Sequence, residues 1–233
     1  MNTKSLCGFT ALLAGSLLAI QAAPKDDLAK AIKQLADAGG YTWKATTESP
    51  QFNMGPTVGK IDKDGWALVS RTWGENTVQS AHHGEKAVTE TQDGWRSLAE
   101  LEADQADNRG RFRARMLRGF EPPALEAGSL LKAVGEVALS DGAYAASLPE
   151  EKVKELMTFR GRGAGGEGPQ ISGAKGSVKF WFEKGMLKKY QYAVQGTMNW
   201  NNQDREMDRT TTVEISDVGT TKVELPAAAK AKL

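Results

Sequence analysis

The sequence contains few of the residues on which most catalytic and metal-binding sites depend. Its single cysteine, Cys7, excludes an intramolecular disulfide and a cysteine-based zinc site. Its two histidines, His82 and His83, are adjacent, and neighbouring residues of a strand point to opposite faces, so they cannot bind one metal ion together. The sequence also lacks G-x-S-x-G and H-E-x-x-H motifs. We therefore expect no catalytic residues, no metal site and no cofactor, and we predict that the protein is not an enzyme.

A clear excess of one charge is also missing. Lys and Arg number 30 against 29 Asp and Glu, a formal net charge of +1, which argues against a nucleic-acid binder because such proteins usually carry a basic excess. Hydrophobic residues make up 40% and charged residues 25% of the chain, a composition typical of globular rather than disordered proteins. After the N-terminal segment, the sequence contains no apolar run of the roughly 20 residues that a membrane-spanning helix needs.

The N-terminus has the pattern of a secretory signal peptide. Lys4 supplies a positive start, residues 6–20 form an uncharged apolar run, and Ala22 and Ala23 offer small residues for cleavage. An uncleaved anchor is the alternative. Cys7 lies inside the apolar run, too early for a lipoprotein signal, so we expect it to be removed. We predict a signal peptide over residues 1–23 and a single domain over residues 24–233, exported to the periplasm or, as the second choice, outside the cell.

The remaining sequence predicts one amphipathic helix followed by mostly antiparallel strands. Three Asp-Gly pairs, at 64–65, 93–94 and 141–142, are typical of tight hairpin turns because these residues accept positive φ angles. The glycine-rich stretch 161–176 predicts a loop. Helices are expected over residues 26–38, 98–117, 124–134 and 150–157, and strands over residues 41–47, 57–62, 66–73, 76–81, 87–92, 177–183, 186–200, 205–216 and 222–225.

The C-terminal strands alternate between apolar and polar residues, which gives the predicted sheet one apolar face and one solvated face. The apolar face has to be covered, and the helices between the strands are the obvious cover. If they leave space, this face could bind an apolar ligand, whereas the alternative for its aromatic residues is ordinary core packing. The candidate ligand-binding residues are Phe180, Phe182, Tyr190, Tyr192, Val194 and Trp200.

Residues 109–118 contain five arginines. Three of them, Arg111, Arg113 and Arg115, form a candidate docking patch for anionic headgroups or for an acidic partner protein. The alternative is neutralisation within the protein, since four acidic residues lie between positions 100 and 107 and helical i, i+4 spacing can pair Asp107 with Arg111.

The stretch GRGAGG at residues 161–166 matches the G-x-G-x-x-G pattern of dinucleotide-binding sites. That function needs a buried strand before the pattern and a helix beginning at its last glycine. Here further glycines and Pro169 follow, and then a strand, so we interpret the stretch as a loop that could border a pocket.

The order of these elements resembles the LolA-like periplasmic lipoprotein-carrier and lipid-binding superfamily. The specific similarities are DGW at residues 93–95, LPEE at 148–151, GSVKFWFEKGMLKKY at 176–190 and DVGTTKVELP at 217–226. The resemblance implies an α+β fold in which a strongly curved antiparallel sheet forms an incomplete β-barrel, with helices over its concave apolar face. In the transporting members of that superfamily the concave face holds acyl chains. These motifs are structural, so no functional residue is transferred from the family.

Two functions follow from this reading. The first is an exported, non-enzymatic protein that binds a hydrophobic ligand such as an acyl chain or a lipid in its half-barrel. The alternative is an interaction or scaffold module of the cell envelope, with a closed core, an envelope protein as partner and no small ligand. Neither involves nucleic acid, and in neither does the mature chain span a membrane.

Overall fold

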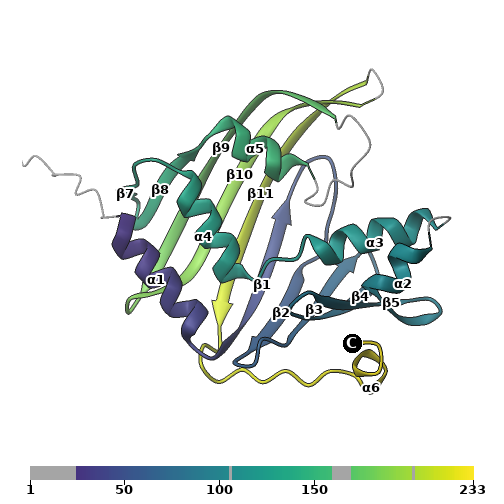
Figure 1. Ribbon diagram of the computed structural model, residues 1–233. Helices are drawn as coiled ribbons and strands as arrows, with labels where there is room; N and C mark the ends of the chain where they lie inside the picture. The colour runs from purple at the N-terminus through teal and green to yellow at the C-terminus, as the bar shows by residue number, and fades with distance from the viewer. Residues whose placement is uncertain (1–24, 105–106, 159–168, 201–202) are drawn as a thin grey trace, which may run out of the picture.

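The computed structural model describes residues 25–104, 107–158, 169–200 and 203–233, so the expected signal peptide lies outside the described residues. Within these ranges eleven strands form one sheet (Figure 1) in the order β6-β5-β4-β3-β2-β1-β11-β10-β9-β8-β7. The strands are β1 (Gly40–Glu48), β2 (Thr57–Asp62), β3 (Ala67–Trp73), β4 (Asn76–His83), β5 (Lys86–Thr91), β6 (Gly94–Ser97), β7 (Ala138–Ser140), β8 (Ala143–Leu148), β9 (Gln170–Glu183), β10 (Met186–Trp200) and β11 (Gln203–Ser216). All neighbouring strands are antiparallel. The helices are α1 (Lys25–Asp37), α2 (Leu98–Ala103), α3 (Asn108–Arg118), α4 (Pro123–Ala133), α5 (Glu150–Met157) and α6 (Ala227–Lys230).

The predicted α+β class with an antiparallel sheet is confirmed. The first and last strands of the sheet in chain order, β1 and β11, pair with each other and join the N-terminal half, β1–β6, to the C-terminal half, β7–β11. The edge strands β6 and β7 do not pair with each other in the part of the chain that the structure describes, so the sheet is open rather than a closed barrel.

Tight turns set the register of the hairpins. Gly65 has a φ of +82° between β2 and β3, and Gly94 has a φ of +99° between β5 and β6. The Asp62 carboxylate also accepts hydrogen bonds from the backbone N–H groups of Asp64 and Trp66, both at 3.0 Å. The Asp-Gly pairs therefore mark hairpin turns, as their sequence predicted.

The expectation of a loop over residues 161–176 is wrong for its last part. Residues 161–168, which include the GRGAGG stretch, lie outside the described residues. Strand β9 begins at Gln170, so residues 170–176 belong to a long strand. Gly173 has a φ of +63°, and the β9–β10 register shifts between Gln195 and Thr197. The glycines mark an irregular region of the strand rather than its end.

The largest core cluster lies between the C-terminal half of the sheet and the helices α1, α4 and α5, which lie on the same side of it (Figure 1). Leu28, Ile32 and Leu35 place one stripe of α1 in this core, as their i, i+4, i+7 spacing predicts. Helices α2 and α3 lie instead beside β5 in the N-terminal half. Among the described residues, no helix is both long and apolar enough to cross a membrane.

The segment after β11 does not form the strand expected over residues 222–225. Because β11 already pairs with β1 on one side and β10 on the other, it offers no free edge for a further strand. The chain instead crosses to the other face of the N-terminal half. There Leu225 and Ala229 pack with Ala81, Val88 and Trp95.

Candidate functional site

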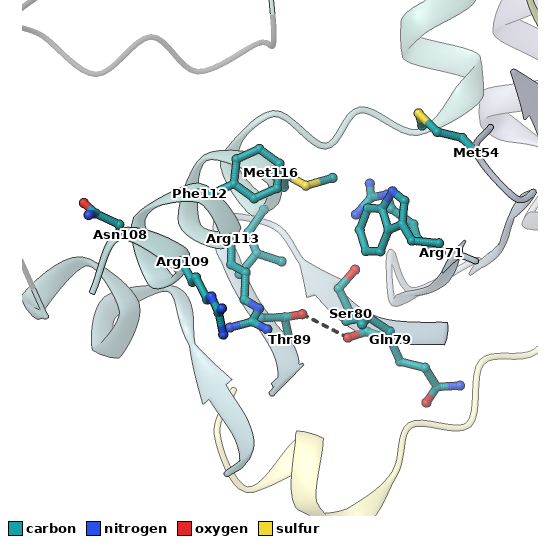
Figure 2. A pocket seen from close by; sticks show the side chains of 13 residues that line it. Met54, Arg71, Gln79, Ser80, Thr89, Asn108, Arg109, Phe112, Arg113 and Met116 are labelled. Atoms are coloured by element: carbon teal, nitrogen blue, oxygen red, sulfur yellow. Dashed lines mark hydrogen bonds between the residues drawn. The ribbon is translucent and has the colours of Figure 1, made fainter. Parts of the chain in front are cut away.

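A cavity of about 530 Å³ lies between α3 and the face of strands β3–β5 that is turned toward this helix, and we call it the α3 cavity. Its size falls in the range of roughly 300–1,000 Å³ that is typical of small-molecule sites. The residues that line it are Met54, Arg71, Trp73, Val78, Gln79, Ser80, Thr89, Asn108, Arg109, Phe112, Arg113, Met116 and Leu117 (Figure 2). The surface of its wall is mainly apolar, although seven of these thirteen residues are polar or charged.

The strand register brings the sheet side of the α3 cavity together. Arg71 on β3 lies opposite Val78 on β4, and Ser80 on β4 lies opposite Thr89 on β5. Because alternate residues of a strand share a face, Val78 and Ser80 both face α3. The Thr89 hydroxyl donates a 3.1 Å hydrogen bond to the carbonyl oxygen of Gln79 (Figure 2). The Thr89 polar group is therefore satisfied within the sheet.

Helix α3 supplies the opposite wall through one of its faces. Arg109, Phe112, Arg113 and Met116 have i, i+3, i+4 and i+7 spacing, which places them on one side of the helix. The helix begins at an N-cap, Asp107, whose side chain accepts a 2.9 Å hydrogen bond from the N–H of Arg109. A second side of α3 is buried against α2 and β5 through Ala114 and Leu117. Two arginines and two large apolar side chains are therefore presented to the cavity.

A smaller hollow of about 200 Å³ adjoins the α3 cavity, and we call it the junction hollow. It shares Arg71, Phe112 and Met116 with the α3 cavity. The other residues that line it are Arg115, Gly119, Glu126, Leu156, Thr158, Tyr192 and Arg209. Arg71 thus stands where the two spaces meet.

The charged groups of these spaces are mostly cationic. Burial lowers the pKa of the Arg71 guanidinium. Arg209 donates a 2.6 Å hydrogen bond to the carbonyl oxygen of Leu156, but its buried Nε–H has no hydrogen-bond partner among the described residues. Glu126 accepts a 2.5 Å hydrogen bond from the Tyr190 hydroxyl. Burial, followed by the charge of Glu126, raises the pKa of Tyr190 well above its usual value.

The two histidines lie on opposite faces, as their adjacency predicts. His82 is 5% exposed, stacks on Phe120 at 4.1 Å and lies 3.1 Å from the Ser80 hydroxyl. His83 stacks on Trp66 at 4.0 Å on the other face. The residues that the structure describes contain no group of three metal-ligating side chains that could hold an ion.

Comparisons with known proteins identify no family for this chain. No protein-family model matches it, and no curated protein matches it either. Among solved structures, it is similar to a protein of unknown function of the DUF3598 family from Nostoc punctiforme, with 14% sequence identity and a TM-score of 0.24. The match covers 87% of this chain and 53% of that protein, so the chain spans about half its length. A likeness this weak supports no conclusion about function.

The structure places the predicted ligand-binding residues in two environments. Phe180 and Val194 are at most 1% exposed and belong to the main core cluster, against which Phe182 is partly buried. Tyr190 and Tyr192 belong to the same cluster, but Tyr192 also lines the junction hollow. A neighbouring hollow of about 190 Å³ includes both tyrosines and Arg71 in its wall. Trp200 is the last residue of β10, and its side chain lies outside the described part of the structure.

The predicted arginine patch is divided between surfaces. Arg113 is half-buried and lines the α3 cavity, whereas Arg111 and Arg115 are exposed. Arg111 donates a hydrogen bond to the Asn108 side chain, and Arg118 pairs with Glu102. The spacing predicted a pair between Asp107 and Arg111, but Asp107 lies 3.6 Å from Arg96 instead.

Sequence reasoning missed the residues that define the α3 cavity on the sheet side. Arg71 and Val78 belong to strands whose alternation is weaker than that of the C-terminal strands, so no apolar stripe marked them. One signal could have drawn attention to Arg71. Ala67, Val69 and Arg71 occupy alternate positions of β3, so the charged side chain of Arg71 lies on the same face of the strand as two buried apolar residues.

Proposed function

We propose that this chain binds a hydrophobic ligand, such as an acyl chain or a lipid, between α3 and the inner face of the sheet, and that it catalyses no reaction. The observation that carries the proposal is the α3 cavity, which combines a volume of about 530 Å³ with a mainly apolar lining. Sites for small ligands are usually concave and apolar with a few placed polar groups. The wall formed by Trp73, Phe112 and Met116 has this chemistry.

The proposal includes a finer description of the fold and of its location. We infer a strongly curved sheet that forms half of a barrel, with helices over its concave apolar face, in a protein exported to the periplasm. The signal-peptide pattern of residues 1–23 supports export, and the resemblance to LolA-like carriers supports the half-barrel. Tyr190 and Tyr192 line a hollow of about 190 Å³ that shares Arg71 with the α3 cavity.

The proposal is tested by blocking the cavity. Val78 is half-buried and faces α3, so the substitution Val78→Trp should fill part of the space that a ligand would occupy. Thr77 is exposed and points to the other face, which makes Thr77→Trp the matched control. The purified mature protein and both variants would be extracted for lipid analysis by mass spectrometry, and then titrated with a fluorescent fatty acid.

We expect the parent and Thr77→Trp to bind the fatty acid and Val78→Trp to lose most of that binding while its thermal unfolding stays cooperative. If the parent carries no lipid and takes up no fatty acid, the proposal is wrong.

An envelope interaction module is the second candidate function. The exposed surface of α3 favours it, because Arg111 and Arg115 are exposed and Phe112, although it lines the α3 cavity, is 45% exposed. Charge reversal of Arg111, Arg113 and Arg115 that abolished capture of an envelope protein, together with an absence of ligand binding, would favour this second function.

A further inference from the structure

The polar part of the α3 cavity is cationic. Arg71, Arg109 and Arg113 line it, and its described lining includes no carboxylate (Figure 2). Arg109 and Arg113 are four residues apart on α3, so their side chains are neighbours on the helix surface. The burial of Arg71 and the partial burial of Arg113 carry a desolvation cost that an anionic ligand would offset, whereas Arg109 is exposed to solvent.

Two other arginines in this region, Arg96 and Arg118, have acidic partners. Arg96 lies 3.4 Å from Asp104 and 3.6 Å from Asp107, and Arg118 pairs with Glu102. Arg71, Arg109 and Arg113 make no ion pair within the described ranges. The nearby carboxylates thus form ion pairs with Arg96 and Arg118, and Asp107 also interacts electrostatically with Arg113, but none of these carboxylates lines the cavity.

The junction hollow adds an independent observation. The buried Nε–H of Arg209 lacks a hydrogen-bond partner in the described part of the chain, and Arg209 and Arg71 line that hollow together with Glu126, whose carboxylate accepts a hydrogen bond from Tyr190. A buried donor without a partner costs free energy, which an acceptor supplied by a ligand would recover. An oxygen-rich anionic group at the boundary of the two spaces would lie close to both guanidinium groups.

From this arrangement we infer that the ligand is a single-chain amphiphile with an anionic head, a carboxylate or a phosphate. Its head contacts Arg71 where the two spaces meet, and its apolar chain extends along Trp73, Val78 and Met116 in the α3 cavity. Arg109 and Arg113 add positive potential along the same cavity. This inference rests on the proposed function, because it specifies the chemistry of the same site.

The test compares three compounds of equal chain length on the mature protein: hexadecanoate, hexadecyl phosphate and the neutral hexadecanol. Each would displace the neutral dye N-phenyl-1-naphthylamine. We expect at least one of the anions to bind about tenfold or more tightly than hexadecanol, as hydrogen bonds to charged groups imply. The ratio of the two anions identifies the carboxylate or the phosphate as the preferred head.

The substitution Arg71→Gln should reduce the preference for the anion to near unity, and Arg113→Gln should weaken it in part. The matched control is Arg111→Gln, which changes an exposed arginine of the same helix and should leave the preference unchanged.

Equal binding of hexadecanol and the anions would overturn the inference while leaving the proposed function in place. A failure of the dye and all three compounds to bind would overturn both. A preference for the anions that survives in both Arg71→Gln and Arg113→Gln would also contradict the inference.

Discussion

His82 should make the stability of this protein sensitive to mild acid. Its imidazole is 5% exposed, packed on Phe120 and beside Ser80. Burial, and then the positive charge of Arg71, lowers the pKa of His82 from 6.5 to about 3. Between pH 6.5 and 3 the imidazole of His82 is therefore protonated in the unfolded chain but neutral in the folded chain. The contribution of His82 to the free energy of unfolding is fully present above pH 6.5 and is lost progressively as the pH falls toward 3.

The magnitude follows from the width of the window. Each pKa unit corresponds to about 1.36 kcal/mol, so the 1.5 units between pH 6.5 and pH 5.0 give a loss of about 2 kcal/mol from this one side chain. The loss would approach roughly 5 kcal/mol near pH 3, which is an order-of-magnitude ceiling for a single buried imidazole. Carboxylates also titrate in acid, so the effect of His82 must be measured as a difference between variants.

The assay is urea unfolding, followed by tryptophan fluorescence, at several pH values between 7.5 and 5.0. The substitution His82→Gln keeps a polar group for Ser80 but removes the titration. The parent should lose about 2 kcal/mol more than His82→Gln over this range. His83→Gln, on the other face, is the matched control and should follow the parent. The reasoning would be refuted if the free energy of unfolding depended on pH in the same way for the parent and for His82→Gln.

Three further predictions concern single contacts and use the same unfolding assay. A Cβ at Gly59 would lie 2.1 Å from the buried ring of Trp43, so Gly59→Ala should cost about 3 kcal/mol, and an unchanged midpoint would contradict this. Tyr190→Phe removes the 2.5 Å hydrogen bond to Glu126 and should cost about 1.5–3 kcal/mol, whereas a cost below about 0.5 kcal/mol would show that the bond contributes little. Arg71→Met removes a desolvated charge that has no ion pair among the described residues, so stability should stay equal or rise by about 1 kcal/mol, and a marked loss would indicate that Arg71 is structural.

Local patterns predicted most of the sheet. The Asp-Gly turns and the alternation located the hairpins to within a residue or two, and α5 and β10 have the predicted bounds. The pairing of β1 with β11 could not be predicted in the same way, because its partners, such as Trp43 and Ile215, are far apart in the sequence. No local signal specifies such a pair. The pairing of β1 with β11 therefore depends on how the whole chain packs.

The candidate site was harder to predict for a related reason. In the sequence, residues 109–118 form one cluster of arginines. Helical geometry divides it, so that Arg109 and Arg113 line the α3 cavity and Arg115 lines the junction hollow, whereas Arg111 lines neither. Which face meets a cavity depends on the strands opposite the helix, and therefore on Arg71 and Val78, which are distant in the chain. The chemistry of the site thus arises from tertiary contacts rather than from a motif.

The most direct test of ligand binding uses a tryptophan that lines the α3 cavity. Bromine atoms quench tryptophan fluorescence at short range, so a dibrominated octadecanoate bound there should quench Trp73. We predict saturable quenching of the delipidated protein at one ligand per chain, and loss of most of that quenching in Trp73→Phe while binding persists. Quenching that does not saturate, or that is unchanged in Trp73→Phe, would contradict a ligand site between α3 and the sheet.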